Sequence, residues 1–123
     1  MNKVDYIVSR FCEFFSVCII FFSFFNQDLF IYKANAKSLE SGKIVFENNC
    51  NVCHVGGKNI IIPEKNLGKK SLEANGMNNF DAIVYQVTNG KNGMPAFGGR
   101  LNETQVEQVA LYVLNEFGKR TEN

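Results

Sequence analysis

The sequence lacks the features that mark several common classes of function. Its 123 residues carry a formal net charge of only +1 and no basic tail, which argues against a nucleic-acid partner. No P-loop, G-x-G-x-x-G stretch or pair of catalytic carboxylates stands out, so no nucleotide-binding or paired-carboxylate enzyme is indicated. There is one histidine and no tryptophan. The length predicts a single domain.

Residues 1–36 differ in composition from the rest of the chain. A weakly positive start precedes a twelve-residue apolar run at residues 14–25, and Ala34-Asn35-Ala36 matches an A-x-A cleavage site. We therefore predict an export signal that is removed after Ala36, which leaves a mature domain of residues 37–123. One alternative is an uncleaved membrane anchor, although Asp28 would cost about 2.5–3.5 kcal/mol in a bilayer. The other is a buried helix of the folded domain.

The four cysteines fall into two groups. Cys12 and Cys18 lie in the leader, and Cys50 and Cys53 belong to the run C-N-V-C-H at residues 50–54. This C-x-x-C-H spacing is the attachment signature of a c-type haem. Two intervening residues place both thiols on one edge of a porphyrin, where each can form a thioether with a vinyl group. We predict those thioethers at Cys50 and Cys53, with His54 ligating the iron.

A glycine-rich segment offers the second axial ligand. Residues 89–100 read N-G-K-N-G-M-P-A-F-G-G-R, and four glycines and a proline exclude regular secondary structure there. Met94 has a soft thioether sulfur, and Pro95 biases its backbone toward an extended conformation. We predict Met94 as the ligand. Two alternatives remain open: Met94 packs on the core, or Met77 is the ligand, although no proline follows Met77.

The mature domain contains four segments with helical patterns. We expect helices from a Ser38 cap to about residue 49, over residues 70–75, over residues 80–88 after an Asn79 cap, and over residues 103–117. Asn102 and Gln105 resemble a capping box for the last of these. A glycine inside the first helix, Gly42, predicts close packing against another backbone, with Tyr112 on the last helix among the candidates.

The segment that follows the motif predicts support for the haem. Residues 55–59 read as a flexible turn, and residues 60–63 read as an extended loop along the porphyrin rather than an edge strand. We expect a backbone carbonyl in this loop to accept the imidazole N–H of His54, because such contacts orient ligating histidines.

These motifs together resemble the cytochrome c6 family. The similarity rests on C-N-V-C-H-V-G-G at residues 50–57, Y-Q-V-T-N-G-K at 85–91 and M-P-A-F-G-G-R-L at 94–101, with V-A-L-Y-V-L at 109–114 also similar. It covers essentially all of residues 37–123. The resemblance implies an all-α class I cytochrome c fold, in which about four helices wrap around one covalently bound haem c.

The resemblance also implies roles for individual residues. It gives the same haem and iron contacts as the motifs do, namely Cys50, Cys53, His54 and Met94. Gln86 matches a position beside the haem that helps to set its potential. Lys91 falls where a haem-propionate contact is expected, and Arg100 matches a basic residue tied to docking on photosystem I. The alternatives are that Gln86 is a helix-surface amide and that Lys91 and Arg100 are solvated charges.

The function that the resemblance implies is electron transfer rather than catalysis. A monomer that does not span the membrane would take one electron from the cytochrome b6f complex and pass it to photosystem I, in the thylakoid lumen of a plastid or in a cyanobacterium. Two departures are visible. Many members end in tryptophan and many algal members are acidic, whereas this chain lacks tryptophan and is nearly neutral. Near-neutrality argues against strong electrostatic steering to a basic partner.

Three other functions remain possible on the sequence. A bacterial periplasmic cytochrome could donate to a respiratory oxidase. A haem enzyme or gas sensor would need an open iron site and a polar distal residue, and the sole histidine is already assigned to ligation. A thiol–disulfide module or zinc site would need a thioredoxin-like βαβ pattern or a fourth metal ligand, and neither is apparent.

Overall fold

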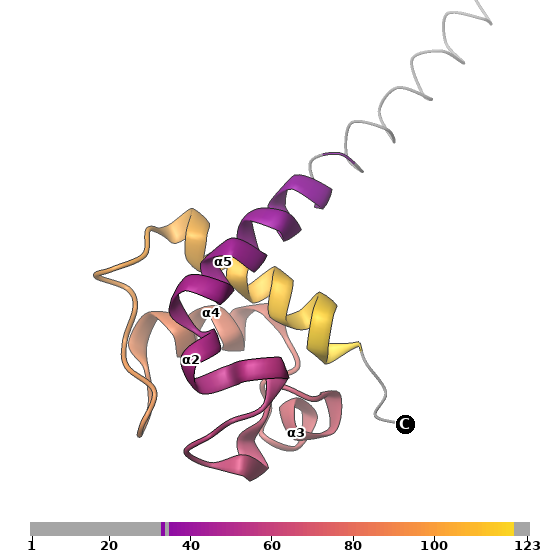
Figure 1. Ribbon diagram of the computed structural model, residues 1–123, viewed down its shortest axis with the longest axis vertical. Coiled ribbons are helices and arrows are strands. Elements are labelled where there is room, and N and C mark those ends of the chain that lie inside the picture. Colours follow the sequence, from indigo (N-terminus) through magenta and orange to yellow (C-terminus); the bar gives the residue numbers. More distant parts are fainter. Residues whose placement is uncertain (1–32, 34, 120–123) are drawn as a thin grey trace, which may run out of the picture. The chain divides into compact units, whose positions relative to one another are not determined.

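The computed structural model describes residue 33 and residues 35–119. The predicted export signal therefore lies outside the described residues except for its last few positions, and its cleavage stays a prediction. Chain contacts group the residues from Lys37 onward into one unit. Figure 1 shows helices joined by loops, and the described residues contain no strand beyond one isolated bridge. The predicted all-α class is confirmed.

Five α-helical segments and three shorter turns make up the described residues. In chain order they are residues 35–49, α2 (Asn51–His54), the 3-10 turn η1 (Val55–Gly57), the 3-10 turn η2 (Pro63–Lys65), α3 (Lys69–Ala74), α4 (Phe80–Asn89), α5 (Glu103–Val113) and the π-helical turn η3 (Leu114–Gly118). None of the described helices is long and apolar enough to cross a membrane.

The predicted caps of two helices are present. Asn79 accepts a hydrogen bond from the backbone N–H of Ala82 at 2.8 Å at the start of α4. Asn102 and Gln105 form a reciprocal capping box at the start of α5, with bonds of 2.9 and 3.0 Å. Both caps satisfy backbone donors that an α-helix leaves unpaired at its first turn.

The predicted start of the first helix is wrong, and the last helix ends in a different form of helix from the one expected. Ser38 is not an N-cap, because residues 35–37 are already helical, and the good helix formers Ala36 and Lys37 extend the first helix past it. The last helix has the expected extent, but it widens into a π-helical turn after Val113. Phe117 lies on this turn and is buried.

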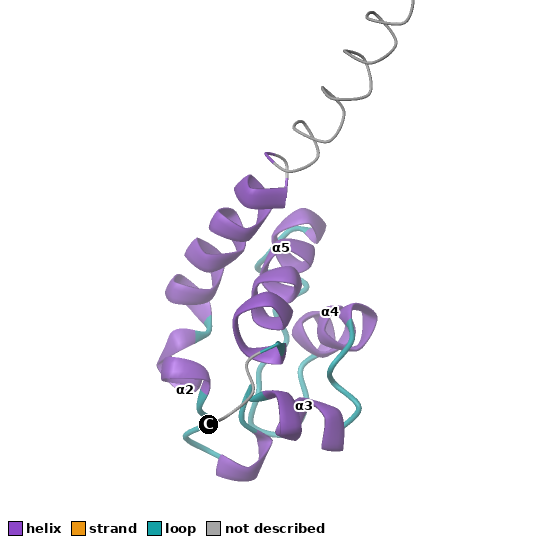
Figure 2. Ribbon diagram, turned by 90° about the vertical axis from the view of Figure 1, so that its right-hand side faces the viewer, coloured by secondary structure: helices purple, strands orange, loops and turns teal. Residues whose placement is uncertain are grey.

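The first helix packs against α5: the two lie side by side in Figure 2 and cross at an angle in Figure 1. A methyl group placed on Gly42 would lie 2.7 Å from the carbonyl carbon of Gln108 and 2.9 Å from Cβ of Tyr112. The predicted close approach is therefore confirmed. The phenyl ring of Phe46 then meets the rings of Tyr112 and Phe117, with centroids 5.4 and 5.5 Å away. This aromatic contact fixes the helix that ends at the haem motif.

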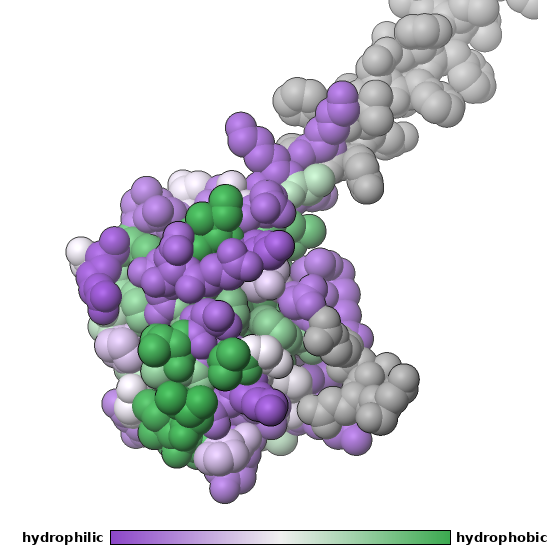
Figure 3. Space-filling view, viewed as in Figure 1, coloured by the Kyte–Doolittle hydropathy of each residue, from purple (hydrophilic) through white to green (hydrophobic). Residues whose placement is uncertain are grey.

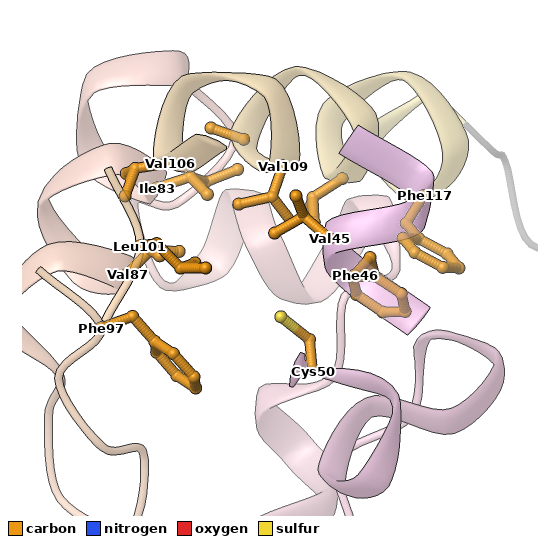
Figure 4. Packing of buried hydrophobic residues seen from close by; sticks show 12 residues of the cluster. Val45, Phe46, Cys50, Ile83, Val87, Phe97, Leu101, Val106, Val109 and Phe117 are labelled. Carbon is orange, nitrogen blue, oxygen red and sulfur yellow. The ribbon is translucent and has the colours of Figure 1, made fainter. Parts of the chain in front are cut away.

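The buried core joins the motif to the rest of the domain. Its members come from the first helix, α4, the loop before α5, α5 and η3: Val45, Phe46, Cys50, Ile83, Val87, Phe97, Leu101, Val106, Val109, Ala110, Val113 and Phe117. Figure 4 shows the Cys50 side chain directed into this cluster, with Phe97 on one side and Phe46 on the other. A motif cysteine is thus part of the core itself.

Candidate haem site

Helix geometry brings the three motif residues together. The backbone N–H groups of Cys53 and His54 both donate to the carbonyl of Cys50, at 3.1 and 2.9 Å. The run therefore forms one helical turn, and residues three and four apart on a helix share a face. This is the physical reason for the spacing of the motif: the turn presents two thiols and one imidazole to the same side.

The two thiols have different surroundings. Cys50 is 8% exposed and Cys53 is half-buried, and both are free cysteines. Burial, reinforced by the neighbouring Cys53, raises the pKa of Cys50 to about 11. The Cys50 thiol is therefore protonated at neutral pH, as a thiol in apolar surroundings should be.

His54 is held by one hydrogen bond. Its Nδ1 lies 3.0 Å from the carbonyl oxygen of Lys58, which can only accept, so Nδ1 carries the proton and the lone pair is on Nε2. Burial lowers the pKa of His54, and the bond to Lys58 partly opposes that shift. A neutral imidazole with a free Nε2 is the form that ligates metals.

The acceptor for His54 was predicted in the wrong place. Residues 60–63 were expected to supply it, whereas Lys58 in the preceding turn does so. The reason is local: η1 turns the chain back immediately after α2, which brings the carbonyl four residues after His54 to its ring.

Residues 60–62 form an irregular, bent loop and not an edge strand, and Pro63 already begins the 3-10 turn η2, so the expected extended loop is only partly present. The side-chain oxygen of Asn59 accepts from the backbone N–H groups of Ile61 and Ile62, at 3.0 and 2.9 Å. The N–H of Ile60 donates to the carbonyl of Cys53 at 3.1 Å. These bonds replace strand pairing and pin the loop against α2.

The loop that carries Met94 is closed by a two-residue hairpin. Lys91 and Met94 exchange two backbone hydrogen bonds of 3.0 and 3.1 Å. Further on, the N–H groups of Phe97 and Gly98 donate to the last turn of α4 at 2.9 and 3.1 Å. The segment has no regular structure, as predicted, yet it is tied down on both sides of Met94.

Gln86 contacts the predicted sulfur ligand directly. Its side-chain amide donates to the sulfur of Met94 at 3.6 Å, from the middle of α4. The amide therefore acts on Met94 and is not a plain surface group. The contact also polarises the sulfur, because a hydrogen-bond donor draws electron density from its acceptor.

A cavity of about 360 Å³ brings all the predicted site residues together. Those lining it are Cys50, Cys53, His54, Gln86, Lys91, Met94 and Arg100. Met77, the alternative ligand, lines the same cavity. Lining alone does not separate the two methionines, but within the described part of the chain only Met94 has a hydrogen bond to its sulfur.

Comparison with known proteins places the chain in a family. The family profile described as cytochrome C oxidase, cbb3-type, subunit III matches residues 37–113. A cytochrome c6 from Bumilleriopsis filiformis is 60% identical over 78 residues, which are 63% of this chain and 91% of that protein. A cytochrome c6 from Porphyra purpurea is 51% identical over 105 residues, which are 85% of this chain and 88% of that protein.

The chain belongs to the cytochrome c6 family. The solved structure of cytochrome c6 from the diatom Phaeodactylum tricornutum agrees, with a TM-score of 0.61, 47% identity, and coverage of 63% of this chain and 91% of that one. The chain is therefore a c-type cytochrome electron carrier with one covalent haem c.

The residues of the cavity fit that group. Its wall is mostly apolar, with Ile61, Leu72, Ile83 and Val109 among its members, as a flat apolar ring requires. The donor set is two thiols, one imidazole nitrogen and a thioether sulfur, which suits thioether attachment and a low-spin axial pair.

Two exposed cations line the cavity. Lys91 and Arg100 are exposed, and neither forms an ion pair within the described part of the chain. The Arg100 guanidinium lies 5.0 Å from the centroid of the Phe97 ring, which fixes its direction. Both remain available for carboxylates, whether those of a propionate or of a partner.

Sequence reasoning missed two contributors. The Lys58 carbonyl has no signal in the sequence, because every residue type supplies the same acceptor. Gly90 could have been identified from the sequence, because a glycine directly after a helix often marks its end. Its φ is 66°, and a methyl group there would lie 2.6 Å from the carbonyl oxygen of Met94. Gly90 therefore permits the loop to approach α4.

Proposed function

We propose that the chain carries single electrons from the cytochrome b6f complex to photosystem I, in the thylakoid lumen of a plastid or the corresponding compartment of a cyanobacterium. The observation that carries the proposal is one cavity lined by an imidazole with a free Nε2 and by a hydrogen-bonded methionine sulfur. When bound, haem c supplies an iron that alternates between Fe(II) and Fe(III).

In this proposal the site residues have distinct tasks. Cys50 and Cys53 would hold the group covalently, and His54 and Met94 would ligate its iron. With both of these residues bound, the iron would have no position left for a substrate, so we propose an electron carrier and not an enzyme. Methionine ligation raises the reduction potential, which suits a donor to a strong oxidant.

An apolar surface near the motif supports transient docking. The side chains of Val52, Val55, Ile60 and Ile61 are all at least 50% exposed. Figure 3 shows apolar side chains gathered over α2 and the segment that follows it. Arg100, which lines the cavity, would add a charged contact with photosystem I, and Lys91 would face a haem propionate. Such encounters typically bury less than about 1,200 Å².

The location of the protein is proposed from its leader. The match to the Porphyra purpurea relative spans 105 residues, more than residues 37–123 contain, so it includes part of residues 1–36. Similarity that extends before residue 37 supports a functional segment there, for which we propose an export signal cleaved after Ala36. Amino-terminal sequencing of native protein tests this: a start at Lys37 supports cleavage, and a retained Met1 contradicts it.

Flash photolysis with photosystem I particles tests electron delivery. The reduced holoprotein should be oxidised on the millisecond scale or faster after a flash. Arg100→Gln should slow the second-order rate, whereas Lys43→Gln, which removes an exposed cation away from the cavity, should leave it unchanged. Reduction by the b6f complex is measured in a second assay. If the holoprotein reacts with neither photosystem I nor the b6f complex, the proposal is wrong.

A respiratory role is the second candidate. The specific observation in its favour is the profile match to a family named after a cbb3-type oxidase subunit. Membranes containing a terminal oxidase provide the test. Faster oxidation of the holoprotein there than with photosystem I would favour a periplasmic donor to respiration.

A further inference from the structure

The sequence contains three Asn-Gly pairs, and one of them lacks the hydrogen bonds that the other two form. They are Asn75-Gly76, Asn89-Gly90 and Asn92-Gly93. Asn-Gly is the pair most prone to cyclisation, because glycine places no side chain beside the attacking backbone nitrogen. Whether a given pair reacts depends on the freedom of that nitrogen and of the asparagine amide.

The first two pairs are engaged at helix ends. The side-chain amide of Asn75 donates to the carbonyl of Ser71 at 2.8 Å, and the N–H of Gly76 donates to Glu73 at 3.1 Å. In the same way, the amide of Asn89 donates to Tyr85 at 2.8 Å. The N–H of Gly90 donates to Gln86, also at 2.8 Å. In both pairs the nucleophile and the leaving group are held by helix carbonyls.

The third pair has neither restraint. Asn92 and Gly93 are exposed, and among the described residues neither the Asn92 side chain nor the Gly93 N–H forms a hydrogen bond. They are the two central residues of the hairpin closed by Lys91 and Met94. Backbone bonds therefore fix the residues on either side and leave the pair itself free.

The hairpin also sets a favourable backbone geometry. Asn92 has a φ of 53°, whereas Gly93 is not among the residues with positive φ. A two-residue hairpin with positive φ only at its first central residue has the φ pattern of a type II′ turn, the mirror image of type II. In the ideal turn of that type the first central ψ is about −120°. That angle brings the next backbone nitrogen to the same side as Cβ, as closure of a five-membered ring requires.

We propose that Asn92-Gly93 is a site of spontaneous deamidation. The backbone nitrogen of Gly93 attacks Cγ of Asn92 and loses its proton to solvent. A C–N bond forms, the bond from Cγ to the amide nitrogen breaks, and ammonia leaves. Water then opens the resulting succinimide at either carbonyl, giving aspartate or isoaspartate. The net change replaces NH with O, and no oxidant or cofactor takes part.

The modification would act on the loop that carries Met94. Either product adds a carboxylate next to Lys91, and isoaspartate also adds a backbone atom to a hairpin whose closing residue is Met94. This consequence rests on the proposed ligand role of Met94. The deamidation itself does not, since it needs only the turn and the free groups.

Peptide mapping of aged holoprotein tests the proposal. Holoprotein is kept at mildly alkaline pH in water enriched in heavy oxygen, and mass spectrometry follows label at the three asparagines. We expect label at Asn92 to appear at least about tenfold faster than at Asn75 or Asn89, a difference of about 1.4 kcal/mol in activation free energy. The same protein in denaturant should label all three at similar rates. Equal rates in the folded protein, or no label at Asn92, would overturn the proposal.

Two variants separate the reaction from its consequence. Gly93→Ala should slow labelling at Asn92 alone, because the methyl group crowds the attacking nitrogen. It meets only the flexible Ile61 side chain at 3.2 Å, so the fold should tolerate it. Asn92→Asp introduces the charge without the extra backbone atom. If aged protein loses its methionine–iron absorption band and Asn92→Asp keeps it, the added atom is responsible. If aged, labelled protein keeps the band, deamidation occurs at Asn92 but does not disturb the Met94 loop.

Discussion

The Cα atom of Gly42 faces the backbone carbonyl of Gln108 so closely that a Cβ atom does not fit between the two helices. We predict that Gly42→Ala destabilises the holoprotein by about 1–3 kcal/mol, the usual range for overpacking a tight contact. Thermal unfolding of the ferric protein measures the effect.

Gly99→Ala is the matched control for this contact. A methyl group on Gly99 has nothing within 4 Å, and the residue has no positive φ. It should change the free energy of unfolding by no more than about 0.5 kcal/mol, as surface substitutions usually do. Equal effects of the two alanines would mean that the helix contact is looser than described.

The bond from Gln86 to the Met94 sulfur predicts a change in potential. An amide donor withdraws electron density from the sulfur and so disfavours the ferric state. Gln86→Leu should therefore lower the reduction potential by on the order of tens of millivolts, given about 59 mV per tenfold change in a one-electron equilibrium. Redox titration of the holoprotein measures it.

Gln86→Met tests whether the donor or the packing is responsible. This variant keeps the length of the side chain and lacks the N–H groups, so it should lower the potential as Gln86→Leu does. If only the leucine variant shifted, side-chain volume rather than hydrogen bonding would be the cause.

The two methionines of the cavity make opposite predictions. Met94→Ala should open an axial position, admit cyanide or carbon monoxide readily, and lower the potential by on the order of 100 mV, within the roughly 0.8 V range that axial ligands span. Met77→Ala should leave ligand binding and the potential nearly unchanged. Stopped-flow ligand binding distinguishes them. If Met77→Ala, and not Met94→Ala, admitted external ligands and lowered the potential, Met77 would be the ligand.

Side-chain patterns predicted most of the fold and of the candidate site. Caps such as Asn79 could be predicted because their hydrogen bonds depend on side-chain type. The grouping of Cys50, Cys53 and His54 could be predicted because one helical turn fixes their spacing. The contact of His54 with the Lys58 carbonyl could not be predicted, because a backbone acceptor is independent of residue type. The start of the first helix was misplaced because Ser38, although favoured at an N-cap, is tolerated inside a helix when the preceding residues are helical.

Gly90 links the backbone of α4 to the position of Met94. A methyl group there would lie 2.6 Å from the Met94 carbonyl oxygen and from the Ala96 nitrogen, and the φ of 66° is itself unfavourable for alanine. Because its ψ is 171°, Gly90 occupies a backbone region that only glycine readily adopts, so Gly90→Ala should combine a backbone cost of about 1–3 kcal/mol with displacement of the Met94 loop. Gly76→Ala isolates the first contribution, because Gly76 has a φ of 67° and open space around it. We expect both variants to lower the unfolding temperature, and Gly90→Ala alone to weaken the methionine–iron band. Loss of that band in Gly76→Ala as well would show that global destabilisation, and not the contact at Gly90, displaces Met94.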